Sequence, residues 1–81
     1  MQEDKPIDQK RYLKIIPKPK TGTRTVLLTK PGQGLPLFSG EGNVDMVCGK
    51  CSVVLVHAII EGQIRNIVLQ CPVCRFYNEI P

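Results

Sequence analysis

The densest run of apolar positions in this chain lies in its C-terminal half, between residues 53 and 69. Residues 52–59 and 64–69 are rich in Val, Ile and Leu, and such runs favour β-strands. Glu61 and Gly62 stand between them, and a Gly at this place is typical of a turn because it adopts positive φ without steric cost. The pattern therefore predicts an antiparallel hairpin over residues 52–69.

Shorter strands are expected on either side of this hairpin. Residues 44–47 lead in extended form into the first cysteine pair, and residues 76–80 are expected to add a short strand after the second pair. Residues 12–16 and 24–29 each carry enough β-branched and apolar side chains for a short strand. No stretch has helical periodicity, so the predicted fold class is small and all-β.

The N-terminal half is interrupted by polar residues and by Pro and Gly. Residues 1–11 are mostly polar or charged and are expected to form a disordered tail. Residues 30–43 hold Pro or Gly at six positions, so no regular element is expected across them. We therefore divide the chain into the tail (1–11), a basic Pro/Gly-rich extension with up to two short strands (12–43) and a C-terminal module (44–81).

The cysteines form two matched C-x₂-C pairs, Cys48 with Cys51 and Cys71 with Cys74, and nineteen residues separate the pairs. Each tight turn presents two sulfurs to one ion, and its backbone N–H groups offset the thiolate charge. The predicted hairpin brings its own ends together, so both pairs meet on the same ion. Four thiolates suit tetrahedral Zn²⁺ and leave no open position, which indicates one structural zinc ion and no catalytic metal.

Two other uses of the cysteines remain open. The same four sulfurs can hold iron, as in rubredoxins. These proteins pack an aromatic core, whereas this chain has two Phe, two Tyr and no Trp. They also place Gly directly after a cysteine pair, where this chain has Ser52 and Arg75. Disulfides are the other alternative, and they form in oxidising compartments.

Together these features predict a zinc ribbon, in which two CxxC knuckles are joined by a β-hairpin and follow an irregular N-terminal extension. A chain of 81 residues buries a modest fraction of its surface, so its core alone is marginal. A structural zinc ion contributes about 10–16 kcal/mol in small peptides. We therefore expect the ribbon to unfold when the metal is removed.

The C-terminal module resembles the zinc-ribbon superfamily, and within it small bacterial and phage zinc-ribbon proteins. The likeness rests on the apolar strand of residues 64–70 that leads into Cys71-Pro72-Val73-Cys74, and on residues 77–80 after it. These features are distantly similar to the Com family of translational activators from Mu-like phages. The resemblance implies a metal-stabilised fold, and superfamily members bind DNA, RNA or proteins or form parts of larger enzymes.

The positive charge of the chain is concentrated at its start. Residues 1–30 hold eight Lys or Arg against three Asp or Glu, a net of +5, whereas residues 31–81 hold three against four, a net of −1. Basic side chains beside an aromatic one favour phosphate contacts with base stacking. The candidate nucleic-acid contacts are Lys10, Arg11, Tyr12, Lys14, Lys18, Lys20 and Arg24. The alternative is a solvated arm whose apolar side chains pack on the ribbon.

The predicted hairpin carries apolar side chains on both of its faces. Val53 and Leu55 alternate with Val54 and Val56, so neither face of this strand is polar. Either residues 13–16 and 26–28 fold over one face, which we favour, or a partner protein or a second copy covers it.

No combination of residues in the sequence indicates catalysis or a small-molecule substrate. His57 is the only histidine, and no Ser, Asp or second His is evidently placed beside it, so we expect an ordinary strand residue.

The first residues lack the pattern of an export signal, and the apolar run of residues 53–60 is too short to span a bilayer. A cytoplasmic location with no membrane partner is therefore expected.

The expected function is that of a small, non-enzymatic protein with structural zinc, used as a protein-interaction or adaptor module. The alternative is a DNA- or RNA-binding accessory or regulatory protein that uses the basic N-terminal arm. The charge distribution favours the first, since only Lys50, Arg65 and Arg75 add positive charge to the ribbon itself.

Overall fold

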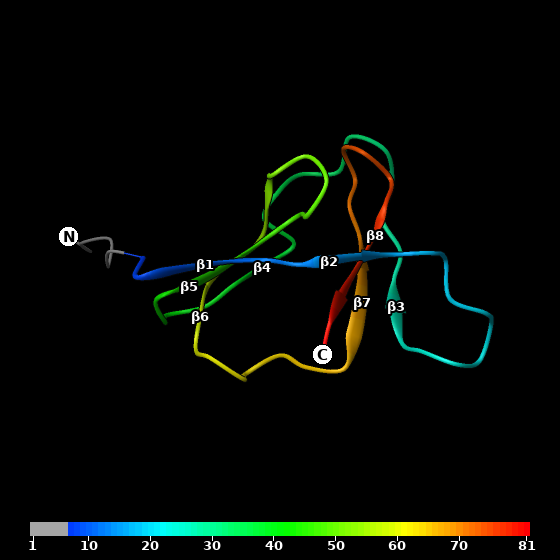
Figure 1. Ribbon diagram of the computed structural model, residues 1–81. Coiled ribbons are helices and arrows are strands. Elements are labelled where there is room, and N and C mark those ends of the chain that lie inside the picture. Colours follow the sequence, from blue (N-terminus) through cyan, green and yellow to red (C-terminus); the bar gives the residue numbers. More distant parts are fainter. Residues whose placement is uncertain (1–6) are drawn as a thin grey trace.

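The first of two sheets is built around a hairpin whose turn carries the first cysteine pair. A computed structural model describes residues 7–81, and in it β5 (Val44–Val47) pairs antiparallel with β6 (Val54–Ile59). β1 (Gln9–Tyr12) adds parallel to β5, and β4 (Phe38–Ser39) adds parallel to β6. The strand order is therefore β1-β5-β6-β4, and this sheet occupies the left half of Figure 1.

The second sheet repeats this plan around the second cysteine pair. β7 (Ile67–Gln70) and β8 (Tyr77–Ile80) form an antiparallel hairpin, and the turn between them holds the cysteines. β2 (Lys14–Ile16) pairs antiparallel with β8, and β3 (Val26–Leu27) pairs parallel with β7. The strand order is β2-β8-β7-β3, and the expected strand after the second cysteine pair is confirmed as β8.

The hairpin that the sequence predicted over residues 52–69 is wrong. β6 and β7 lie in different sheets, and each pairs with the strand across its nearest cysteine pair. The physical reason is that each C-x₂-C turn itself reverses the chain, so the strands before and after it meet directly. β4 and β3 then occupy the remaining edges of β6 and β7, and no edge is left for the two to share.

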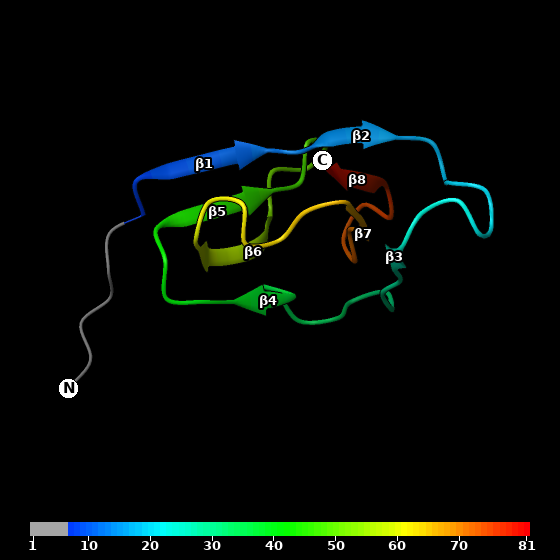
Figure 2. The same ribbon diagram turned by 90° about the horizontal axis from the view of Figure 1, so that it is seen from below.

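One extended segment crosses both sheets and joins them. β1 and β2 are separated only by Leu13, which is buried and donates its backbone N–H to Val47 O at 2.9 Å. Figure 2 shows this segment running along one side of the molecule, first beside β5 and then beside β8. The two sheets therefore lie side by side and not stacked, and the chain is elongated, with extents of 43 × 26 × 18 Å.

Two stretches expected to be irregular contain strands. Residues 9–11 were assigned to a disordered tail but lie in β1, because pairing with β5 satisfies their backbone groups; residues 1–6 of that tail lie outside the described residues. β4 lies within the Pro/Gly-rich stretch of residues 30–43. There Gly40 allows a close approach to β6, since a Cβ at this position would lie 2.7 Å from Ala58 O.

A single hydrophobic core crosses the two sheets and includes two of the cysteines. Its buried members are Leu13, Val44, Met46, Cys48, Leu55, Val56, Ile59, Leu69, Cys71 and Ile80. Ile15 and Leu27 pack against this core, as expected for the extension, although they do so from edge strands and not as a cover over one face. Among residues 7–81 no helix is long and apolar enough to cross a membrane.

Candidate metal centre

The first knuckle (residues 48–53) is a tight turn closed by backbone hydrogen bonds. Cys48 N donates to Val53 O at 2.9 Å, and Ser52 N donates to Cys48 O at 3.0 Å. Lys50 N points at Cys48 Sγ from 3.4 Å, so the turn supplies a donor to the sulfur. Ser52 has φ of 67°, a left-handed conformation that lets the chain leave the turn as β6.

The second knuckle (residues 71–76) repeats the first at every one of these positions. Cys71 N donates to Phe76 O at 2.9 Å, Arg75 N donates to Cys71 O at 2.9 Å, and Val73 N lies 3.4 Å from Cys71 Sγ. Arg75 has φ of 69°. The two knuckles are thus the same local structure. Ser52 and Arg75, which follow the second cysteine of each knuckle, both adopt the left-handed conformation that Gly favours. The absence of Gly at these two positions therefore does not argue against an iron site of the rubredoxin type.

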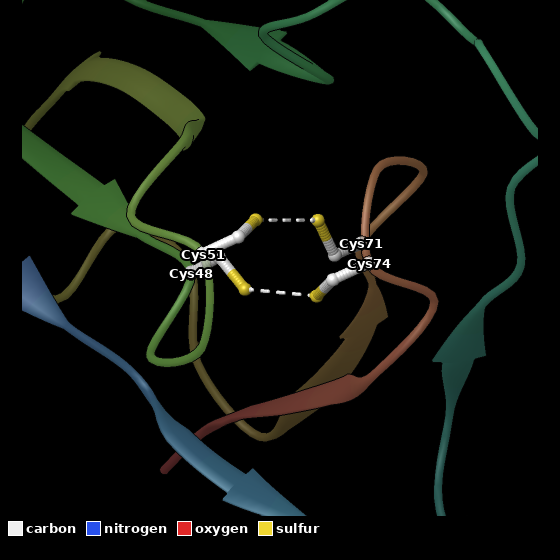
Figure 3. Close-up of side chains that lie close together, drawn as sticks. All are labelled: Cys48, Cys51, Cys71 and Cys74. Atoms are coloured by element: carbon white, nitrogen blue, oxygen red, sulfur yellow. Dashed lines mark hydrogen bonds between the residues drawn. The ribbon is translucent and has the colours of Figure 1, made fainter.

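The sulfurs of the two knuckles converge on one point, as Figure 3 shows. Cys48 Sγ lies 3.6 Å from Cys74 Sγ, Cys51 Sγ lies 3.6 Å from Cys71 Sγ, and all four sulfurs lie within 4.8 Å of one another. A tetrahedral ion with Zn–S bonds of about 2.3 Å requires sulfurs about 3.8 Å apart. No pair is at the disulfide bond length of about 2.05 Å, so the four cysteines are free thiols. Their convergence means that the cluster can hold one metal ion.

The thiols of the cluster differ in their tendency to ionise. Burial opposes ionisation of Cys48, but donors from the backbone of Cys51 and Lys50 and from the side chain of Asn78 outweigh it and lower the Cys48 pKa from 9.0 to about 7. Burial and the sulfurs of Cys71 and Cys48 raise the pKa of Cys51, whereas burial and the three other sulfurs raise the pKa of Cys74 to about 12. Four adjacent thiolates repel one another, so a divalent cation is what stabilises the fully ionised cluster.

Asn78 ties the second hairpin to the first knuckle. It lies in β8 and is fully buried; its Nδ2 donates to Cys48 Sγ at 3.5 Å, and its Oδ1 accepts from Gly49 N at 2.9 Å. Gly49 is also pressed against the crossing segment, because a Cβ there would lie 2.1 Å from Leu13 O. Sequence reasoning missed this role of Asn78, since nothing in the local pattern marks it.

The second knuckle is held by the loop that follows β3. Arg75 donates from its two terminal nitrogens to Thr29, at 2.8 Å to the backbone O and 3.2 Å to Oγ1. Thr29 in turn bonds to both the side chain and the backbone of Gln70, and Gly32 N reaches Pro72 O at 3.4 Å. Residues 29–32 at the start of the Pro/Gly-rich stretch therefore support the second knuckle.

The candidate nucleic-acid residues are spread over β1, β2 and the loops after β2, and two of them are held in ion pairs. Lys10, Arg11 and Tyr12 lie on β1, and Lys14 lies on β2. Arg11 pairs with Glu61 at 2.6 Å, and Arg24 pairs with Glu79 at 2.6 Å in a partly buried position. Lys18 and Lys20 are in the loop after β2, and Tyr12 is 65% exposed. Their role in nucleic-acid contact stays a prediction.

His57 has a partner that sequence reasoning did not find. Its Nδ1 lies 2.9 Å from Oδ1 of the buried Asp45, which also accepts from Ala58 N at 3.0 Å. Ala58 has φ of 55°, and the pairing of β5 with β6 is irregular here. The Asp45 carboxylate thus accepts the Ala58 N–H that has no partner in the irregular β5–β6 pairing. His57, which is half exposed, contacts the same carboxylate oxygen from the surface.

Comparisons with known proteins provide no relative for this chain. No protein family, no curated protein and no solved structure matches it. The candidate metal centre therefore rests on its own geometry, which is the convergence of the four sulfurs from two matched knuckles.

Proposed function

We propose that this chain is a small zinc-binding protein in which one structural Zn²⁺ holds two hairpins together as a scaffold for protein interaction. The convergence of four sulfurs within 4.8 Å carries the proposal. Each hairpin contributes one knuckle, so the ion links two sheets that otherwise share the crossing segment and the core. Loss of the ion then separates the two halves of the structure.

Zinc fits this cluster better than the alternatives do. Thiolates are ligands that suit Zn²⁺, and the sulfur separations of 3.6 Å are close to those of a tetrahedral zinc site. Iron accepts the same ligands. The core around the sulfurs is built from aliphatic side chains such as Leu55 and Leu69, without the aromatic packing of rubredoxins. We therefore place zinc first and make iron an outcome of the metal analysis.

The proposed role of the ion is structural. Four protein sulfurs fill a tetrahedral shell and leave no position for water or substrate. Cys48 and Cys71 are fully buried, and Cys51 and Cys74 are partly exposed, so the structural role rests on the complete set of four ligands. We accordingly propose a non-enzymatic protein, whose function depends on the surface that the metal centre keeps in shape.

Exposed apolar side chains support protein contact as the use of that surface. Tyr12 is 65% exposed and Phe76 is 43% exposed. Aromatic side chains are enriched at protein–protein interfaces relative to the rest of the surface. The proposal is therefore an adaptor or interaction module.

Metal analysis of the purified full chain tests this proposal directly. We expect one zinc per chain, and loss of the folded circular-dichroism and NMR signatures when a chelator removes it. Cys51→Ser removes one ligand and should reproduce that loss, whereas Ser39→Ala, a comparable change at an exposed site in β4, should not. Bound iron, a disulfide, or an unchanged fold after chelation would each contradict the proposal.

Nucleic-acid binding by the basic arm is the second candidate function. Tyr12 is largely exposed and lies on β1 with Lys10, close to Lys14 on β2, a combination suited to phosphate contact and base stacking. The likeness of the C-terminal module to phage translational activators also supports it. A gel shift with single-stranded RNA and DNA at low salt tests it: binding that weakens with salt and with Tyr12→Ala is expected if this second function is correct.

A further inference from the structure

A shallow groove of about 510 Å³ lies between the end of β2 and the second knuckle. Ile15, Ile16 and Pro17 line it on the β2 side, and Cys74, Arg75 and Phe76 line it on the knuckle side. Most of the exposed lining is carbon, and Phe76 is 43% exposed. We name this feature the β2 groove. It offers an apolar side chain a place to insert beside the metal centre.

The strand that borders the β2 groove has a free edge. β2 is the outermost strand of its sheet, with β8 on its inner side and no further described strand on its outer side. Along an edge strand of this kind, alternate N–H and C=O groups point away from the sheet and can pair with another extended chain. In Figure 2 the segment of β1 and β2 runs along the outside of the molecule, so this edge is accessible.

Positive charges surround the apolar floor of the groove. Lys14 stands on β2, Lys18 and Arg75 line the groove, and Lys50 Nζ lies 5.3 Å from the centre of the Phe76 ring. The nearest acidic residue of the paired strand, Glu79, is engaged by Arg24. A ligand that combines apolar and acidic groups is therefore complementary to this surface.

We propose that the β2 groove and the edge of β2 together bind an extended, acidic peptide segment of a partner protein. The peptide adds as a strand to β2, and alternate side chains then face the groove. An apolar side chain inserts between Pro17 and Phe76, and Asp or Glu side chains meet Lys14 and Lys18. This inference rests on the proposed interaction function and names the partner's chemistry.

Two other occupants fit less well. A second copy of this chain that paired through the same edge would add its own Lys14 and Lys18 to the positive charge already there, and like charges repel. A nucleic acid satisfies the charge, but its phosphates gain nothing from the carbon lining of the groove or from the row of backbone donors and acceptors. An acidic peptide uses all three features.

A defined peptide provides the test. The probe is a short fluorescein-labelled peptide in which Glu alternates with Leu and Phe, and its binding to the zinc-loaded full chain is followed by fluorescence anisotropy. We expect saturable binding of this probe, with weaker binding of the same peptide carrying Lys in place of Glu. Absence of saturable binding overturns the inference, and so does preferential binding of a single-stranded oligonucleotide.

Matched variants locate the binding site. Lys18→Glu at the groove should weaken binding about tenfold, a loss of ~1.4 kcal/mol, while Lys10→Glu on β1 makes the same charge change away from the groove and should have little effect. Phe76→Ala should also weaken binding, whereas Val73→Ala, at an exposed position that does not line the groove, should not. Equal effects of Lys18→Glu and Lys10→Glu overturn the inference, because they indicate attraction by net charge alone.

The same samples separate this inference from the proposed function. Zinc content and the folded NMR spectrum are measured on each protein before binding. A chain without zinc contradicts the proposed metal centre. A zinc-loaded, folded chain that does not bind the peptide overturns only the peptide inference.

Discussion

Asn78 holds Cys48 across the boundary between the two hairpins. Its Nδ2 lies 3.5 Å from Cys48 Sγ, and its Oδ1 accepts from Gly49 N at 2.9 Å. One buried amide in β8, the strand that follows the second knuckle, therefore makes two hydrogen bonds to the first knuckle. The two knuckles have the same backbone conformation but different neighbours, since Asn78 contacts the first knuckle and Thr29 contacts the second. Asn78 therefore helps to fix the position of the first knuckle relative to the second, independently of a metal ion.

Removing this amide should destabilise the protein. Asn78→Ala removes the acceptor of the part-buried hydrogen bond from Gly49 N, and a hydrogen bond of this kind contributes about 0.5–1.5 kcal/mol. Urea unfolding of the zinc-loaded protein measures the loss, and competition with a chromophoric chelator should show weaker zinc binding. Asn43→Ala is the matched control, since that amide is exposed and bonds to Asp8. Equal stability of the two variants would contradict the role given to Asn78.

The same contact should set the pH at which zinc is released. Protons compete with zinc for thiolates, so metal is lost as pH falls. Donors including Asn78 lower the Cys48 pKa from 9.0 to about 7, which keeps the thiolate available at lower pH. Asn78→Ala should raise this pKa and shift zinc release to higher pH. An acid titration with a zinc indicator measures the midpoint, and an unchanged or lower midpoint would argue against the hydrogen bond.

Ser52 and Arg75, the left-handed residues that follow the second cysteine of each knuckle, should respond differently to replacement by Gly. Ser52→Gly relieves a positive φ of 67° and should stabilise the protein by about 0.5–1 kcal/mol. Arg75→Gly relieves φ of 69° but removes both bonds to Thr29, so its net effect should be destabilising. Thermal unfolding of the two variants compares them. Equal stabilisation by both would show that the Arg75–Thr29 contact contributes little.

Gly49 should not tolerate a side chain. A Cβ there meets Leu13 O at 2.1 Å, so Gly49→Ala has to displace the segment that crosses both sheets. Overpacking of this kind costs about 1–3 kcal/mol. Gly34→Ala is the control, since nothing lies within 4 Å of its Cβ position. Denaturant midpoints of both variants provide the measurement, and a neutral Gly49→Ala would mean that the segment is loosely held.

The Asp45–His57 pair predicts an unequal response of its two members. Asp45→Ala leaves Ala58 N–H without its buried acceptor and should cost about 1–3 kcal/mol. His57→Ala removes a half-exposed partner and should cost less than about 1 kcal/mol. Asp45→Asn keeps an acceptor oxygen and should lie between the two. If His57→Ala were the more damaging change, the histidine would have a role beyond bracing Asp45.

The sequence determined the local parts of this protein. The C-x₂-C spacing encodes a tight turn with sulfur-directed N–H groups, so the four cysteines that converge within 4.8 Å were singled out from spacing alone. The apolar runs likewise identified the extended segments that became β6 and β7. These features depend on interactions between residues close together in the chain, which a sequence pattern records directly.

Only the tertiary structure decided which segments became neighbours. Apolar runs show that β6 and β7 are extended, but both have two usable edges, and the choice of β4 and β5 for one and β3 and β8 for the other comes from long-range pairing. The contacts of Asn78 with Cys48 and of Asp45 with His57 were invisible for the same reason. Their partners lie 30 and 12 residues away, and a single polar side chain leaves no periodic pattern that predicts what it will meet.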